Sequence, residues 1–433
     1  MNAIRTDWVA RMLGVLLAFH AMADLLRPEF IPVNPGSDVI AHEPSFWSSF
    51  IHLVVTLVVL PLSLWAGHFG RCDLTRSGWF ALLTTGLLLF VAISLIQVDT
   101  IMPLIYFVLL AMVLLAALVF ASTDLARDGG FQNMLAAAAI GYGLILFAAI
   151  VIGEYSFGRL ASRAGPTNLG LVATMCLCCS AAIEHPRLRW GLIALSALTL
   201  FLTSARGAMV TSFAAALVMI VIAIARCEPR RRMGYYALFL CGVLTLPLLI
   251  PYVVEDLLRV DDPRRGLGSG LTGRSEAWGQ ALRLFAENPL TGVGYRTHET
   301  YITVATSAHE AYLAVLAELG PLALLIYLFL IVGAFVRELI RALRSGDRAS
   351  IASAAFMCAF ILIGFTENMA LATGLPMPFA MMFITAFAWR RGLRATLADN
   401  AKASARRGPL MLTTSYSAEP AMQPDQSKGR STA

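Results

Sequence analysis

The sequence predicts an all-α protein of the membrane, with about 12 transmembrane helices and one large loop on the outer side. Of its 433 residues, 58% are hydrophobic and 14% are charged, whereas a soluble chain carries about a quarter charged residues. The apolar residues come in blocks of about twenty, the length that crosses about 30 Å of hydrocarbon. This composition excludes an ordinary cytosolic enzyme, a nucleic-acid-binding protein and a disordered scaffold.

The apolar blocks set the boundaries of the expected helices. They lie at 8–26, 46–68, 77–96, 101–122, 133–153, 168–184, 188–204, 207–225, 234–254, 311–336, 349–367 and 375–390. Arg5, the apolar stretch and Ala21-Met22-Ala23 also fit a cleavable signal peptide. Arg11 and Asp24 interrupt that pattern, so the first block is expected to remain as a helix.

The distribution of Lys and Arg predicts the orientation. Alternate loops, both termini included, hold 23 of the 33 basic residues, and the opposite side holds 10. By the positive-inside rule, both termini are cytoplasmic. Four regions follow: nine helices in 1–254, an outer loop at 255–310, three helices in 311–394, and a tail at 395–433 whose low hydrophobicity predicts disorder. The net charge of +6 is therefore mostly a signal of topology.

Neither a metal nor a cofactor is expected. Cys176, Cys178 and Cys179 lie in an apolar block without a neighbouring histidine or acid, which indicates small core residues. The acidic residues of the outer loop have only generic spacing for a divalent cation; they are Asp256, Asp261 and Asp262.

The outer loop contains one predicted helix, from Ser275 to Glu287. Trp278, Ala281, Leu282 and Phe285 share one face of it. This face suits either the plane of the outer leaflet or packing onto neighbouring helix ends. Arg274 would lie in the first turn, where a cation is unfavourable beside the helix dipole unless an anion is near.

Several arginines on the outer side are candidates for binding an anion. Each alone fits a side chain that extends to lipid headgroups, but together they suit a diphosphate, since guanidinium pairs bidentately with phosphate oxygens. They are Arg159, Arg163, Arg206 and Arg274.

His309 is the candidate general base, because a neutral imidazole accepts a proton from a hydroxyl near neutral pH. The alternative is an interfacial histidine bonded to a carbonyl. Glu310 would orient His309 or bind substrate, or act as the base itself.

Short motifs in this order resemble the O-antigen ligase / Wzy polymerase superfamily. They are Thr203-Ser204-Ala205-Arg206-Gly207, Gly273-Arg274-Ser275-Glu276-Ala277-Trp278, Asn288-Pro289-Leu290-Thr291-Gly292-Val293-Gly294, His309-Glu310-Ala311-Tyr312-Leu313 and Glu318-Leu319-Gly320. The segment from Arg163 to Asn168 looks like a shortened Arg/Gly/Pro-Asn element of that family. The chain departs from the family at Glu310, where Asn or Asp is usual, and by placing Thr167 between Pro166 and Asn168.

The resemblance implies glycosyl transfer without a metal at the periplasmic face of the bacterial inner membrane. The donor would be an oligosaccharide on undecaprenyl diphosphate, and the acceptor a growing glycan or a lipid A core sugar. Catalysis would depend on His309, Arg206 and Arg274, with Arg159, Arg163, Arg296 and Glu310 binding substrate. A polymerase of exopolysaccharide or O-antigen repeat units is preferred, and an O-antigen ligase is the alternative. Other polysaccharide assembly and export proteins are possible partners.

A transporter or flippase of lipid-linked glycans is the alternative from another class. Transporters place ionisable residues near the bilayer midplane, whereas the central thirds of these predicted helices are almost free of charge. This distribution favours chemistry at the membrane surface.

Overall fold

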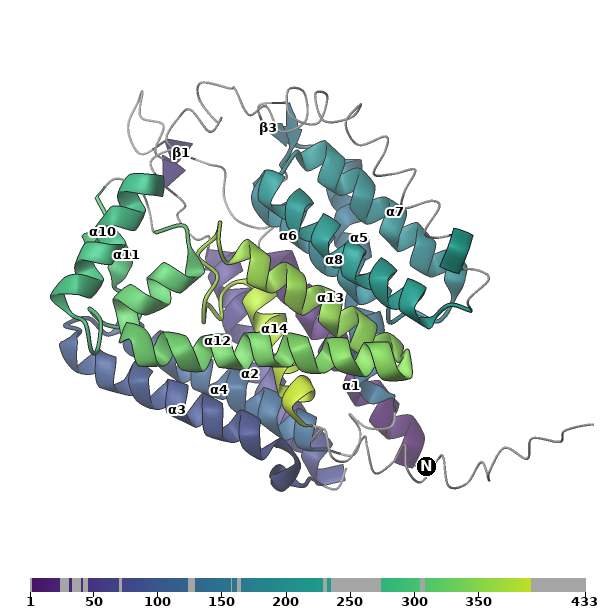
Figure 1. Cartoon of the computed structure of the whole chain (residues 1–433), viewed down its shortest axis with the longest axis horizontal. Helices are drawn as coiled ribbons and strands as arrows, with labels where there is room; N and C mark the ends of the chain where they lie inside the picture. The colour runs from purple at the N-terminus through teal and green to yellow at the C-terminus, as the bar shows by residue number, and fades with distance from the viewer. Residues whose placement is uncertain are drawn as a thin grey trace, which may run out of the picture. The chain divides into compact units, whose positions relative to one another are not determined.

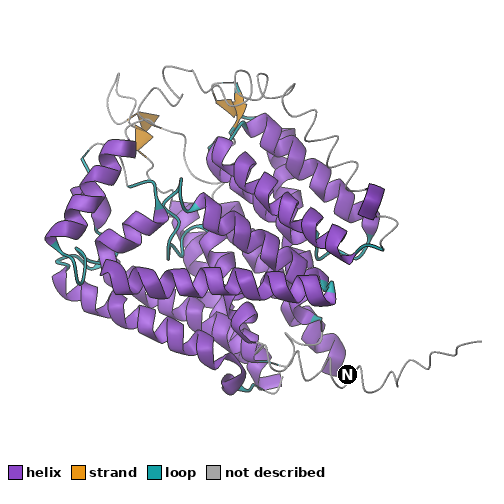
Figure 2. Cartoon of the chain, in the orientation of Figure 1, coloured by secondary structure: helices purple, strands orange, loops and turns teal. Residues whose placement is uncertain are grey.

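The computed structural model describes residues 2–23, 31–32, 40–41, 46–69, 72–123, 129–156, 158–161, 165–228, 232–234, 274–303 and 308–390. Helices dominate these residues, and Figure 2 shows them joined by loops and accompanied by two short hairpins. The hairpins pair β1 (Ile31–Pro32) with β2 (Ile40–Ala41), and β3 (Tyr155–Ser156) with β4 (Arg159–Leu160). Within the described residues the helices are α1 (Asn2–Met22), α2 (Phe46–Phe69), α3 (Gly78–Ser94), α4 (Met102–Ser122), α5 (Gly130–Ile152), α6 (Pro166–Ser180), α7 (Pro186–Thr203), α8 (Arg206–Arg226), α10 (Arg274–Glu287), α11 (His298–Tyr301), α12 (Ala311–Ser345), α13 (Arg348–Ile363) and α14 (Pro376–Arg390), with short 3-10 turns at Leu74–Ser77 and Leu95–Gln97.

The predicted spans overlap these helices wherever the structure describes them, with ends that differ by up to nine residues. Residues 235–254, which make up nearly all of the ninth predicted span, and the tail at 395–433 lie outside the described residues. Six of the described helices are long and apolar enough to cross a membrane, namely α2, α3, α4, α5, α8 and α12. Large apolar side chains remain exposed on them, among them Leu82, Leu144 and Phe213. Surfaces of this kind suit contact with lipid, and the chain is a multi-pass membrane protein.

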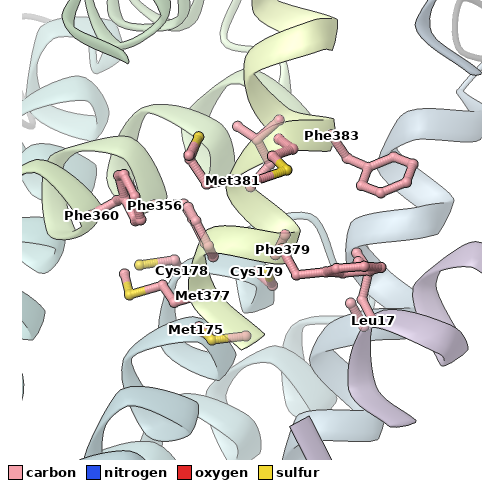
Figure 3. Packing of buried hydrophobic residues seen from close by; sticks show 14 of the residues in the cluster. Leu17, Met175, Cys178, Cys179, Phe356, Phe360, Met377, Phe379, Met381 and Phe383 are labelled. Carbon is pink, nitrogen blue, oxygen red and sulfur yellow. The ribbon is translucent and has the colours of Figure 1, made fainter. Parts of the chain in front are cut away.

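The core lies where α14 packs against its neighbours. All residues from Pro376 to Arg390 are buried, and Figure 3 shows Phe379 and Phe383 of this helix among the side chains of the core. Cys178 and Cys179 lie in the same cluster. Together with Cys176 they serve as small apolar core residues, as predicted.

Helix α12 extends beyond its predicted end at 336, to Ser345. The extension is polar, and the prediction placed its arginines in a loop. In the structure Arg341 and Glu338 form a buried ion pair, and the Arg337 guanidinium lies 4.7 Å from the centre of the Trp389 ring. The ion pair lies within α12 and stabilises its last turns, and the Arg337–Trp389 contact attaches the end of α12 to α14.

Near its start, α12 breaks at Gly320, which has φ 81° and is followed by a proline. The break interrupts the helical hydrogen bonds of the carbonyls of Ala317 and Glu318. The segment after α10 supplies the missing donors, because Val293 N–H donates to Ala317 at 2.8 Å and Gly294 N–H to Glu318 at 3.1 Å. Figure 1 shows α12 between α3 and α13, with α10 at its N-terminal end.

Glycine is required on both sides of this contact. A Cβ on Gly292 would lie 2.2 Å from the carbonyl carbon of Glu318, and a Cβ on Gly320 would lie 2.4 Å from the oxygen of Leu290. Both glycines also have positive φ. The Gly292-Val293-Gly294 segment therefore joins the stretch after α10 to the break in α12.

Candidate active site

Several predicted site elements meet at the turn that follows α13, residues 364–368, which we call the 364–368 turn. Ala311 N–H, at the start of α12, donates to the oxygen of Gly364 at 2.7 Å. A Cβ on Gly207, in the first turn of α8, would lie 3.2 Å from the Thr366 hydroxyl oxygen. The starts of α8 and α12 therefore both approach this turn, although about 100 residues separate them in the sequence.

Arg274, the first residue of α10, extends to the same turn. Its Nη2 lies 3.5 Å from Oε1 of Glu367, and the two side chains are 27% and 22% exposed. Burial raises the pKa of the Glu367 carboxyl, and the Arg274 guanidinium opposes that shift. In this structure a carboxylate thus occupies the position beside Arg274 where the sequence predicted an anion.

His309 lies immediately before α12 and is half-buried. Its backbone is left-handed, with φ 48°. Burial lowers the pKa of the imidazole from its ordinary value of 6.5, and the positive charge of Arg274, with that of His298 when it is protonated, lowers it further. The imidazole is therefore neutral at pH 7 and available to accept a proton.

Glu310 has a structural contact that the sequence analysis did not foresee. It is the N-cap of α12, and its carboxylate accepts a hydrogen bond from Leu313 N–H. Burial raises the pKa of Glu310, and the hydrogen bonds from the backbone of Leu313 and Tyr312 lower it. Since this cap begins the helix directly after His309, it fixes the backbone that carries the candidate base.

The tight turn between α7 and α8 contains Arg206 as the first residue of α8. Arg159, in β4, supports that turn. Its Nε donates to the oxygen of Thr203 at 2.6 Å, and its Nη2 to the oxygen of Ser204 at 3.0 Å. Arg159 was predicted to bind substrate. In the structure it instead donates hydrogen bonds to the backbone just before Arg206.

A buried pair lies behind the 364–368 turn. His298 Nδ1 and Glu318 Oε1 are 2.5 Å apart, and the His298 side chain is 1% exposed. Asn368 connects this pair to the surface: its Nδ2 lies 3.5 Å from His298 Nε2 and donates to Glu299 Oε1 at 3.1 Å. Neither His298 nor Glu318 was predicted as a site residue.

Arg296 is linked to this set through Glu299. Its Nη1 is 3.9 Å from Glu299 Oε1, and its guanidinium lies over the Tyr106 ring, 5.5 Å from the centre. Burial lowers the pKa of Arg296, but Glu299 and Glu318 reverse this and leave it raised. Its charge is therefore already matched by acidic neighbours.

Helix α10 was predicted at 275–287 and forms from Arg274 to Glu287, ending at Asn288-Pro289 as expected. It packs against α12, and Ala277 and Ala281 are its buried residues. Of the two alternatives, the structure shows packing onto a neighbouring helix. The predicted apolar face is rotated relative to the observed one, because small alanines permit close approach to α12 while Leu282 stays exposed.

Backbone strain concentrates around this region. The described non-glycine residues with positive φ are Ser204, Arg296, His309 and Leu371. Such conformations cost about 1 to 3 kcal/mol each and cluster at functional sites. Arg296 and His309 are candidate site residues, and Ser204 lies two residues before Arg206.

Glu367 and Asn368 were not predicted as site residues, because the predicted span 349–367 placed this stretch at the end of a helix. The available signal was an acid and an amide next to each other in an otherwise apolar stretch. Other candidates lie outside the described residues: Arg163 and the possible metal ligands Asp256, Asp261 and Asp262.

The arrangement combines a neutral imidazole with arginines from two helix starts, and so offers a proton acceptor and positive charge for an anion. A search of curated proteins gave no match. Residues 191–328 match the family model described as O-antigen ligase. This segment contains Arg206, Arg274, His298, His309 and Glu318. The match supports membership of the chain in the O-antigen ligase / Wzy superfamily.

Proposed function

We propose that this protein transfers glycosyl units at the periplasmic face of the bacterial inner membrane. The donor is an oligosaccharide on undecaprenyl diphosphate, and the protein polymerises such units into exopolysaccharide or O-antigen. The O-antigen ligase domain supports a function of ligase or polymerase type in glycan assembly. The observation that carries the proposal is the approach of the starts of α8, α10 and α12, with Arg206, Arg274 and His309, to the 364–368 turn.

In the proposed reaction, His309 takes the proton of an acceptor hydroxyl. The hydroxyl oxygen attacks the anomeric carbon of the donor, and the bond between that carbon and the diphosphate oxygen breaks. The electron pair stays on the departing diphosphate. The proton held by the imidazole then passes to solvent or to the diphosphate, which restores the neutral base.

Arg274 and Arg206 stabilise the negative charge that builds on the diphosphate. Glu367 is the partner of Arg274 in the absence of the donor, and the diphosphate replaces that carboxylate. Two guanidiniums supply charge stabilisation that a divalent cation provides in other transferases, and we propose that no metal is needed.

The test uses purified protein in lipid nanodiscs with a defined undecaprenyl-diphosphate oligosaccharide, with and without lipid A core as acceptor. A ladder of product lengths without core supports the polymerase. Product that forms only with core assigns the ligase instead. If no product forms with or without lipid A core, the result contradicts the proposed glycosyl transfer and favours a transporter. The His309→Ala protein, checked for folding by its melting temperature, is expected to give no product.

A further inference from the structure

We infer that Arg296, Glu299 and Asn368 form a saccharide-binding subsite that holds the acceptor sugar beside His309. We call these three residues the acceptor subsite. The inference rests on the proposed function and adds to it, because it assigns a separate surface to the acceptor and a chemical class to its ligand.

The position of the acceptor subsite follows from the two neighbours of His309. Arg274 and His298 both lie close enough to His309 to influence the pKa of its imidazole. Arg274 contacts Glu367, and His298 contacts the adjacent Asn368. An acceptor hydroxyl at His309 therefore has the diphosphate arginine on one side, and the remainder of its sugar extends toward Asn368.

The buried pair fixes how Asn368 is presented. In neutral His298 with Nδ1–H donating to Glu318, Nε2 is an acceptor and faces the Asn368 Nδ2 group. The two hydrogens of that Nδ2 serve His298 and Glu299. The amide oxygen is consequently directed away from both partners, as an oriented acceptor for a ligand hydroxyl.

The charges of the two sides differ in a way that matches the two ligands. On the donor side, Arg274 contacts the Glu367 carboxylate, and the start of α8, which carries Arg206, approaches the adjacent Thr366; two guanidiniums near one turn suit a diphosphate. In the acceptor subsite, the Arg296 guanidinium is matched by Glu299. A paired guanidinium and carboxylate present donors and acceptors without net charge, and these groups suit the hydroxyls of a sugar.

The acceptor subsite is also held in place and remains accessible. Arg296 keeps φ 60°, a strained conformation for a residue with a Cβ, and its guanidinium covers the Tyr106 ring. Glu299 is 38% exposed and Arg296 is 23% exposed. The buried His298–Glu318 pair forms the base of the arrangement, and the exposed groups form its outer face.

The test measures binding of two probes to the protein in nanodiscs. Saturation-transfer NMR with a panel of methyl glycosides of neutral hexoses, deoxyhexoses and N-acetylhexosamines reports the saccharide. Undecaprenyl diphosphate alone reports the donor side. We compare Glu299→Gln and Asn368→Ala with the matched control Glu287→Gln, a change at another exposed acid of the same outer segment.

We expect at least one glycoside to bind the unchanged protein and to lose about tenfold in affinity in each subsite variant, the loss of roughly one hydrogen bond to a charged or oriented group. Binding of undecaprenyl diphosphate is expected to stay unchanged in both variants and to weaken in Arg274→Ala. Glycoside binding that is absent from the unchanged protein, or equal in all variants, would overturn the acceptor subsite. Loss of undecaprenyl diphosphate binding in Glu299→Gln would overturn it as well. Undecaprenyl diphosphate binding that is insensitive to Arg274→Ala would instead count against the proposed function.

Discussion

The surroundings of His309 directly set the protonation state on which its proposed role as a base depends. It is half-buried, and its neighbours Arg274 and His298 disfavour a positive charge on it. A base works in its deprotonated form, so a lowered pKa keeps His309 active to a lower pH than an exposed histidine.

We therefore expect the rate of transfer to fall only below about pH 6.5, as the pH passes through the lowered pKa of His309. Arg274→Gln removes a positive charge and is expected to raise that pKa, which moves the acidic limb to higher pH. The measurement is the pH dependence of kcat/KM, with residual activity followed for the variant. Arg283→Gln, at an exposed arginine of the same helix, is the control. An acidic limb that stays in place or moves down in Arg274→Gln would contradict this account.

Arg159 acts on the site through another residue. Its two hydrogen bonds to the backbone at 203 and 204 hold the turn that precedes Arg206. Arg159→Ala is expected to lower kcat about tenfold or more, since each lost bond is worth about 1 kcal/mol. Arg159→Lys is expected to recover only part of this, because an ammonium lacks the planar fork of guanidinium. Full recovery with lysine would show that only the charge matters.

At the scale of elements, the break in α12 and the segment after α10 form one unit. The broken helix exposes two carbonyls, and the backbone of Val293 and Gly294 satisfies both. The buried Glu318 that holds His298 lies at the same break. The position of the His298–Glu318 pair thus depends on this contact.

Gly292→Ala is expected to disrupt that unit, because the new Cβ would overlap the backbone of Glu318 and Gly292 has φ 67°. We expect a lower melting temperature and loss of transfer. Gly279→Ala is the matched control: Gly279 lies inside α10 with nothing within 4 Å of the new Cβ. Since alanine favours a helix over glycine by about 1 kcal/mol, this control is expected to be neutral or stabilising. If both changes alter the melting temperature and transfer equally, the contact between Gly292 and the Glu318 backbone does not support the site.

At the scale of the whole molecule, orientation in the membrane is the central prediction. The positive-inside rule places α10 on the outer side and the end of α12 in the cytoplasm. In a variant without its seven natural cysteines, Leu282→Cys on the exposed side of α10 is expected to react with an impermeant maleimide in intact spheroplasts. Ser345→Cys at the end of α12 is expected to react only after permeabilisation. Labelling in the reverse pattern would place the candidate site in the cytoplasm.

Much of this organisation was predictable from local patterns. Apolar blocks of span length gave the helices that the structure describes, and the amphipathic pattern with its Asn-Pro stop gave α10 to within one residue. The polar end of α12 was not predicted, because charged residues after an apolar block are typical of a loop. In the structure two of them, Glu338 and Arg341, form a buried ion pair within the helix.

The candidate site was predictable only in part, for a related reason. His309, Arg206 and Arg274 carry chemistry that residue type and motif order reveal. Glu367, Asn368 and His298 were not predicted, since their partners lie far away in the sequence and only packing brings them together. Arg159 was assigned to substrate, yet the fold directs two of its donors to backbone carbonyls.

The sequence by itself determined the class of protein, most helix boundaries and the residue types able to bind a diphosphate and accept a proton. These properties depend on composition and short-range periodicity, which a chain carries before it folds. Only the tertiary structure decided that the starts of α8, α10 and α12 approach one turn. It also decided that the carboxylate of Glu367 lies beside Arg274. Contacts between segments so distant in the chain depend on how the helices pack, and no local pattern in the sequence specifies that packing.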